Sequence, residues 1–232
     1  MGKKVIVVSL GGSLIIPNKI NTGFLNQFKK ILLKHSRKHK FVIVCGGGQT
    51  ARNYINGLES LTLNPSKKNL LQSYLGISST RLNARFMTYF FGKDANQGIP
   101  NDMKDVENYL KKHDIVFCGA LRYAKKQTSD STAAKLAHYL NSPFINLTNV
   151  SGLYDKNPKK YRSAKFIPEI SHEDFLKIAN KTKFHPGQHF VLDQTAAKTI
   201  EKYNIKTYIL GDNLKNLDNL LNERHFVGSV IE

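Results

Sequence analysis

The sequence has few cysteines and no long apolar run, and each shortage excludes a class of protein. Only Cys45 and Cys118 occur among the 232 residues, which is too few for a disulfide framework. Each closes a short apolar run typical of a buried strand, so we expect reduced thiols in the core. No apolar segment approaches the roughly 18 residues that a membrane-spanning helix needs, and we therefore expect a cytoplasmic protein.

Acidic residues are also scarce. The chain has 17 Asp and Glu residues against 35 Lys and Arg residues, which gives a formal net charge of +18. Such a charge attracts nucleic acid, acidic lipid or a polyanionic ligand. The lysines are spread over most segments, however, and no basic run is interleaved with aromatic residues as in many nucleic-acid sites. We interpret the charge as a solvated surface and expect no nucleic-acid partner.

Two common nucleotide-binding motifs are missing. The sequence contains neither Gly-x-x-x-x-Gly-Lys-Ser/Thr nor Gly-x-Gly-x-x-Gly, the patterns of the P-loop and of the dinucleotide-binding fold. A nucleotide site in this chain must therefore belong to another type.

Short β-branched runs alternate with helical patterns along the whole chain, which is typical of an α/β protein with a mainly parallel sheet. Strands are expected at residues 5–9, 41–45, 115–118, 143–150 and 207–210, and helices at 69–91, 172–179 and 194–203. Thr22 is expected to cap one further helix, and the cluster of Thr128, Ser129 and Asp130 to open another. Since 41% of the residues are hydrophobic, we expect one domain over residues 1–232.

Glycine turns follow the first two predicted strands. Gly11 and Gly12 end the first, and the run Gly46, Gly47 and Gly48 ends the second. In an open parallel sheet, ligands collect beyond the carboxyl ends of the strands, where glycines expose N–H groups to phosphate. Each turn alone is explained equally well by the need of turns for glycine. Two such turns on adjacent strands favour a pair of facing phosphate sites.

Five stretches occur in the order and spacing of the amino-acid kinases. They are residues 7–13 (VVSLGGS), 46–52 (GGGQTAR), 128–130 (TSD), 148–154 (TNVSGLY) with Pro158, and 192–198 (LDQTAAK). The resemblance runs from about residue 4 to 231. Residues 75–77 (LGI) followed by 81–84 (RLNA) are most similar to archaeal UMP kinases. The resemblance implies the amino-acid-kinase fold, a three-layer α/β sandwich around a mainly parallel open sheet.

What the resemblance implies for function is phosphoryl transfer from ATP to a nucleoside monophosphate, with UMP as the expected acceptor and Mg²⁺ as cofactor. The acceptor would bind to residues of about 1–140 and ATP to about 141–232. The implied acceptor-binding residues are Gly46, Gly47, Gly48, Arg52, Ser73 and Thr128. Amide donors with a forked guanidinium one helical turn later suit a phosphate.

The same resemblance implies residues for catalysis and for the donor. Gly11 and Gly12 match the turn that cradles the transferring phosphoryl group, and Asp130 matches the acidic residue that organises the cations or Mg²⁺ around it. Asp130 could also be an ordinary helix cap. The implied ATP-binding residues are Ser9, Thr148, Asn149, Tyr154, Asn157, Pro158 and Asp193. No side chain is implied as a direct metal ligand.

Three positions depart from the family pattern. Ser9 stands where many members carry lysine, and Ser73 stands where UMP kinases carry an acidic residue that holds the acceptor ribose. Residues 119–127 replace a loop with a glycine pair and Pro-Gly that helps to surround the acceptor. The replacement adds Arg122, Lys125 and Lys126, which either bind a phosphate in another way or are solvated.

These departures leave two other functions open. Molybdenum and tungsten storage proteins are similar to UMP kinases in sequence, and His138, His185 and His189 would be candidates for an oxoanion cluster. A kinase for another small phosphate, such as isopentenyl phosphate, is the third reading. Because the apolar positions of the predicted helix 69–91 are spread widely, we also expect a homo-oligomer, and the family resemblance implies a hexamer.

Overall fold

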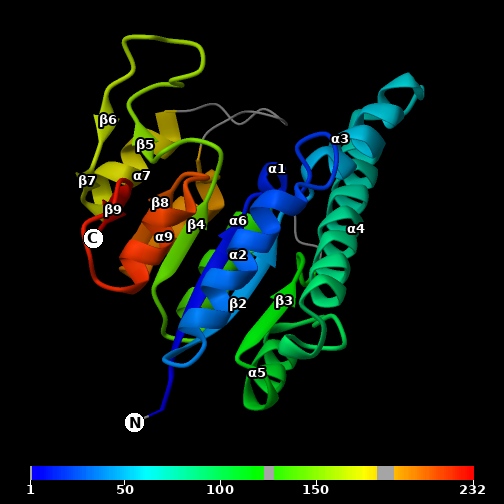
Figure 1. The fold of residues 1–232 in the computed structure, drawn as a ribbon. Helices are drawn as coiled ribbons and strands as arrows, with labels where there is room; N and C mark the ends of the chain where they lie inside the picture. Colours follow the sequence, from blue (N-terminus) through cyan, green and yellow to red (C-terminus); the bar gives the residue numbers. More distant parts are fainter. Residues whose placement is uncertain (1, 123–127, 182–190) are drawn as a thin grey trace.

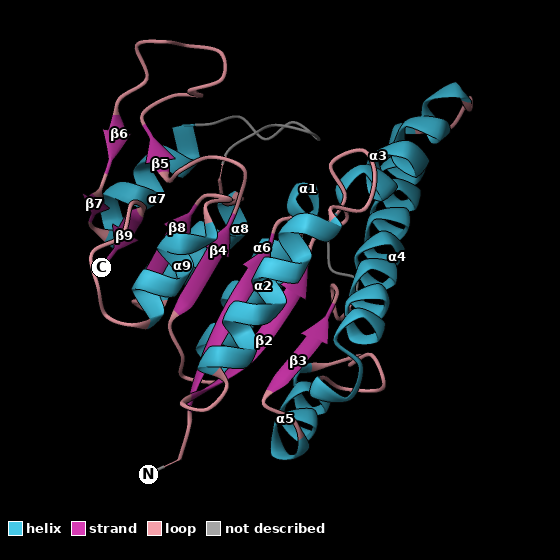
Figure 2. Cartoon of the chain, viewed as in Figure 1, coloured by secondary structure: helices cyan, strands magenta, loops and turns pink. Residues whose placement is uncertain are grey.

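The computed structural model describes residues 2–122, 128–181 and 191–232. Figures 1 and 2 show a central sheet with helices on both faces, together with a small two-stranded sheet beside it. The described helices are α1 Gly12–Ile15, α2 Thr22–His35, α3 Gly48–Gly57, α4 Pro65–Phe91, α5 Met103–Lys112, α6 Ser129–Tyr139, α7 His172–Lys181, α8 Gln194–Lys202 and α9 Leu214–Leu221, with short 3₁₀ turns at Leu58–Ser60 and Gly92–Asp94.

In the described part of the chain, the main sheet has seven strands in the order β3-β2-β1-β4-β8-β9-β7. Their bounds are β1 Lys4–Leu10, β2 His39–Cys45, β3 Ile115–Cys118, β4 Phe144–Leu147, β7 Glu169–Ile170, β8 Thr207–Leu210 and β9 Ser229–Ile231. All neighbouring pairs are parallel except β8 with β9. The small antiparallel sheet pairs β5 Leu153–Tyr154 with β6 Phe166–Ile167.

Two hydrophobic cores separate the layers. Alternate side chains of the central strands point to opposite faces. Val8 therefore belongs to the core that includes residues of α2, α4 and α9, whereas Val7 belongs to the core that includes residues of α5, α6, α7 and α8. The two cysteines lie in different cores, Cys45 in the first and Cys118 in the second. Both thiols are free and buried, and burial raises their pKa values. The predictions of a three-layer α/β sandwich and of reduced core cysteines are therefore confirmed.

Several predicted boundaries were wrong, and local capping explains two of them. Asn21, not Thr22, caps α2, because its side chain accepts a hydrogen bond from the Phe24 N–H. The long helix α4 begins at Pro65, where proline suits the first turn because no N–H partner is needed there. The strand predicted at residues 143–150 pairs only over Phe144–Leu147.

Helix α5 was not predicted, although the sequence carries its signals. Asp102 caps it by accepting a hydrogen bond from the Asp105 N–H, and Val106 and Leu110 form its buried face. No described helix has the length and apolar character that crossing a bilayer requires.

His39 begins β2 at the end of the sheet opposite the glycine turns. Among the described residues, its Nδ1 is a buried side-chain atom without a hydrogen-bond partner. Burial lowers the pKa of His39, and so do the nearby charges of His35, Lys4 and Lys38. The unfolded chain therefore binds a proton at this position more tightly than the native protein does.

We expect the free energy of unfolding to fall as the pH drops below the unfolded pKa of His39, about 6.5, towards its lower folded value. Replacing His39 by glutamine should reduce this acid sensitivity, whereas the same change at exposed His225 should not. Urea unfolding of the three proteins at pH 7.5 and 5.5 measures the difference. An unchanged pH dependence in His39→Gln would contradict the assignment.

Candidate functional site

The carboxyl ends of four parallel strands line up at one edge of the sheet. Three hydrogen bonds extend the ladder beyond the strands, from the Gly46 N–H to the Leu10 carbonyl, from Gly11 to Leu147 and from Thr148 to Leu210, each at 2.9 Å. The chain runs from β1 to β2 and β3 on one side and returns to β4 on the other side of β1. A crevice is expected at such a reversal of strand order, and it is where open α/β sheets bind ligands.

The two glycine turns meet at this edge, backbone against backbone. A Cβ added to Gly12 would lie 2.0 Å from the Gly48 nitrogen, and one added to Gly46 would lie 2.4 Å from the Gly12 nitrogen. Gly48 also has a positive φ of 60°, which favours glycine. The predicted proximity of the turns is therefore observed, and it gives these glycines a packing role besides any role in binding phosphate.

Asp130 lies at the start of α6, a helix that packs against β1. The buried Ser9 hydroxyl donates to its Oδ1 at 2.6 Å. Thr128 caps the same helix and donates its hydroxyl to Asp193, and Asp193 in turn accepts from the Thr195 and Ala196 N–H groups at the start of α8. One polar cluster, called here the Asp130 cluster, thus joins β1 to the first turns of α6 and α8. It consists of Ser9, Thr128, Asp130 and Asp193.

Loss of solvent, together with the neighbouring charge of Asp193, raises the pKa of Asp130 to about 7, against a smaller opposite effect from the Ser9 hydroxyl. The Asp130 carboxylate is therefore buried with a neutral hydrogen-bond partner, the Ser9 hydroxyl, and this bond supplies no positive charge to compensate it. An approaching cation, or the metal of a metal–phosphate complex, would relieve this cost.

Comparison with known proteins places the chain in a family. The family model described as "Amino acid kinase family" matches residues 4–211. The uridylate kinases of Thermococcus sibiricus and Thermococcus kodakarensis are each 33% identical over 229 residues, covering 98% of this chain and 99% of theirs. The chain belongs to the amino acid kinase family.

Solved structures of this family agree with the fold. The uridylate kinase of Archaeoglobus fulgidus superposes with a TM-score of 0.84 at 31% identity, covering 98% of this chain and 99% of that one. The UMP kinase of Ureaplasma parvum, at 21% identity, gives a TM-score of 0.79. The resemblance inferred from the sequence is confirmed for the family and for the fold.

Two residues predicted to bind the acceptor of this amino acid kinase lie away from the cluster. Arg52 follows the second glycine turn on α3, where its exposed guanidinium donates to the Gln49 side chain and the Pro17 carbonyl. The Ser73 hydroxyl donates to the Asn69 carbonyl one turn earlier in α4. Both side chains thus donate hydrogen bonds to nearby groups of the protein, and their role in acceptor binding stays a prediction.

Five of the seven predicted ATP-binding residues lie on the segment that follows β4, whereas Ser9 lies on β1 and Asp193 caps α8. Thr148 and Asn149 directly follow β4. Tyr154 lies on β5 with its ring edge-on to Phe166, at 5.4 Å between centroids. Asn157 then forms a turn by accepting the Lys159 N–H at its side chain, next to Pro158. Asp193, grouped with them from the sequence, instead accepts hydrogen bonds from the Thr128 hydroxyl and from the Thr195 and Ala196 N–H groups.

The replaced loop after β3 is described only up to residue 122. Arg122 is exposed and forms an ion pair with Asp102 at 2.9 Å, which favours the solvated interpretation of this side chain. Lys125 and Lys126 lie outside the described residues, as do His185 and His189. His138, the third candidate for an oxoanion cluster, is exposed and stacks on the Tyr203 ring at 3.5 Å between centroids.

Sequence reasoning missed the residues of α4 that hold the site loops. Asn83 donates to the Gly46 and Gly47 carbonyls, and Thr80 accepts the Ala120 N–H. Arg81 donates to the Ala120 and Leu121 carbonyls. The only sequence signal was a run of polar residues on the inner face of a helix, together with the similarity of residues 81–84 to UMP kinases.

Proposed function

We propose that this chain is an ATP-dependent kinase that transfers a phosphoryl group to UMP, producing UDP. The observation that carries the proposal is its full-length relationship, at about one third identity, to the archaeal uridylate kinases. The geometry supports it, because two glycine turns lie in contact at the carboxyl edge of the sheet, as transfer between two phosphates requires.

Such a transfer needs positioning and charge neutralisation rather than a side-chain base, because the acceptor phosphate oxygen is already ionised. We assign Gly46, Gly47, Gly48 and Arg52 to the acceptor phosphate, and we also assign Ser73 and Thr128 to acceptor binding. Gly11 and Gly12 hold the transferring group. Asp130 positions the positive charges around it, and its hydrogen bond from Ser9 fixes its orientation.

For the donor, we assign Ser9, Thr148, Asn149, Tyr154, Asn157, Pro158 and Asp193 to ATP. The carboxylates of Asp130 and Asp193 are the kind of oxygen donors that Mg²⁺ prefers, and Mg²⁺ is commonly held by few carboxylates together with substrate phosphates. The residues present therefore fit Mg²⁺ that enters with ATP. When bound, Mg²⁺ neutralises charge on the phosphates.

We also propose a division of the chain into an acceptor-binding part at about residues 1–140 and an ATP-binding part at about 141–232. Its setting would be the cytoplasm and its assembly a homo-oligomer, with six copies as the family resemblance implies. The exposed Tyr74, Leu82 and Tyr89 on the outer side of α4 support an interface there.

The two other functions are not favoured. The first relatives found are uridylate kinases along their whole length, and His138 is already engaged with Tyr203. Oxoanion storage and phosphorylation of isopentenyl phosphate therefore remain only as outcomes of the test.

A coupled assay with ATP, Mg²⁺ and a panel of UMP, CMP, AMP and isopentenyl phosphate tests the proposal. We expect turnover to be fastest with UMP and to be abolished by removal of Mg²⁺. Preference for isopentenyl phosphate would replace the acceptor. Absence of turnover, together with bound molybdenum or tungsten by elemental analysis, would favour storage and overturn the kinase.

A further inference from the structure

The inner face of α4 carries polar side chains where a helix usually buries apolar ones. Ser79, Thr80 and Asn83 are all buried there, and Asn83 is only 3% exposed. A buried amide costs stability unless it is hydrogen-bonded. Their partners therefore show what this face of the helix does.

Asn83 contacts the second glycine turn at two consecutive peptides. Its Nδ2 donates to the Gly46 carbonyl at 2.7 Å and to the Gly47 carbonyl at 3.1 Å. In a trans peptide, the C=O and the following N–H point in opposite directions. Because Asn83 holds these two carbonyls on the side of α4, the N–H groups of Gly47 and Gly48 are turned away from α4.

The other bonds of the turn fix its ends and one of the two carbonyls. The Gly46 N–H is bonded to Leu10 and the Gln49 N–H to Ile16, and the Gly47 carbonyl also accepts the Ala51 N–H at 3.2 Å. Among the described residues, the Gly46 carbonyl is bonded only to Asn83. Without Asn83, the Gly46 carbonyl would be free to rotate towards the space in which a phosphate must sit.

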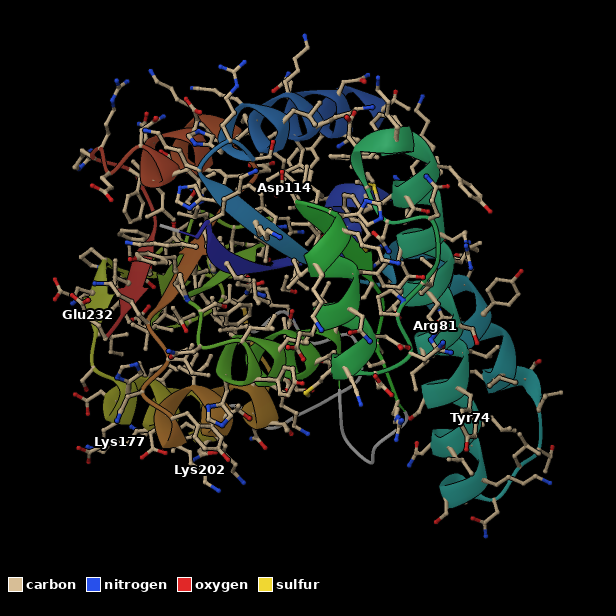
Figure 3. The ribbon with its side chains drawn as sticks, turned by 90° about the horizontal axis from the view of Figure 1, so that it is seen from below. Tyr74, Arg81, Asp114, Lys177, Lys202 and Glu232 are labelled. Carbon is tan, nitrogen blue, oxygen red and sulfur yellow. The ribbon has the colours of Figure 1, made fainter. Side chains whose placement is uncertain are left out.

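The residues beside Asn83 hold the neighbouring loop. Thr80 accepts the Ala120 N–H at 2.9 Å, and Arg81 donates to the Leu121 carbonyl at 2.7 Å. Figure 3 shows Arg81 on α4, with Tyr74 farther along the helix towards its N-terminal end. One helical turn thus supports both the loop after β2 and the loop after β3.

We propose that Asn83 is a positioning residue for the acceptor phosphate, acting by fixing the Gly46 carbonyl and, through the same peptide, the Gly47 N–H. It does not touch the substrate itself. This inference rests on the proposed function, because it names the residue that orients the amides of that same acceptor site.

Replacing Asn83 by alanine tests the inference. We expect the KM for UMP to rise roughly ten- to hundredfold, as for the loss of a buried hydrogen-bonding pair and the misorientation that follows. The KM for ATP should change by less than about twofold. Asn83→Ser keeps one short hydroxyl donor and should recover part of the affinity for UMP. If the alanine variant does not fold, the KM values of the serine variant for UMP and ATP are compared instead.

Asn96 offers a matched control. It is fully buried and also holds backbone, donating to the Gly98 and Phe117 carbonyls and accepting the Phe117 N–H. Asn96→Ala should lower the melting temperature without changing the ratio of the two KM values. A similar ratio in the Asn83 and Asn96 variants would overturn the inference, because it would show that Asn83 only stabilises the fold.

Measurements on the unmodified chain distinguish failure of the inference about Asn83 from failure of the proposed function. If it phosphorylates UMP and Asn83→Ala keeps the same KM for UMP, only the inference about Asn83 fails. If the unmodified chain neither binds UMP by calorimetry nor turns it over, the proposed function fails, and the inference fails with it.

Discussion

Replacing Asp130 by asparagine should lower kcat by about two to three orders of magnitude and, at the same time, raise the melting temperature. The loss of rate follows from removing the charge that positions cations around the transferring phosphate, an effect comparable to the loss of one electrostatic contact in a preorganised site. The asparagine side chain has the same shape and can still accept the hydrogen bond of Ser9.

The gain in stability follows from the raised pKa of Asp130, which is about 7 against an ordinary value of 3.8. Between these values the native protein binds the proton more tightly than the unfolded chain, so this group makes the protein less stable as the pH rises. Above pH 7 the full cost of the buried carboxylate is present. Asparagine removes it, so we expect a melting temperature several degrees higher at pH 8.

Steady-state kinetics and calorimetric melting of both proteins at pH 8 and pH 5 check this prediction. The difference in melting temperature should shrink at pH 5, where most of the Asp130 carboxyl in the native protein is already protonated. An Asp130→Asn variant that keeps its rate, or that melts lower than the unmodified protein at pH 8, would show that Asp130 has only a structural role at the start of α6.

Gly12→Ala should reduce kcat/KM for both substrates by about a hundredfold or more, since a displacement near 1 Å in a catalytic site can cost that much. A Cβ at this position would lie 2.0 Å from the Gly48 nitrogen and 2.7 Å from the Gly46 carbonyl carbon. Both are backbone atoms, so the clash cannot be relieved by turning a side chain. The two turns have to move apart.

Gly57→Ala is the control for this change. Gly57 ends α3 with helical φ and ψ of −58° and −30°, and a Cβ there would have no neighbour within 4 Å. Alanine should therefore leave the kinetics unchanged and stabilise the protein by up to about 1 kcal/mol. Kinetic constants for Gly12→Ala equal to those of Gly57→Ala would mean that the contact between the turns is not needed for transfer.

The sequence predicted the sheet well because its central strands are continuous apolar runs that end in glycine. Residues 207–210 and 115–118 were located to the residue, since each is a short β-branched or aromatic run between polar segments. The prediction that the cluster of Thr128, Ser129 and Asp130 opens a helix was also correct, and Thr128 is the residue that caps α6. Errors occurred where competing caps lay side by side, as with Asn21 and Thr22, because only the backbone conformation decides between them.

The site was only partly predictable. The glycine turns could be found because glycine at the end of a strand is visible in the sequence, and parallel neighbours bring such ends together. The hydrogen bonds of Asn83 and the pairing of Thr128 with Asp193 could not be found, because they join residues 36 and 65 positions apart. No local pattern encodes such a contact, which depends on how α4, α6 and α8 pack against the sheet.

The ladder of hydrogen bonds that continues from Gly46 through Gly11 to Thr148 has a geometric consequence for the transfer. Neighbouring strands lie about 4.8 Å apart, whereas reacting atoms must approach to about 3–3.5 Å. If the two turns hold the donor and acceptor phosphates as proposed, the spacing of the strands sets the separation between them, and only a small inward shift of the ligands is left to complete the approach.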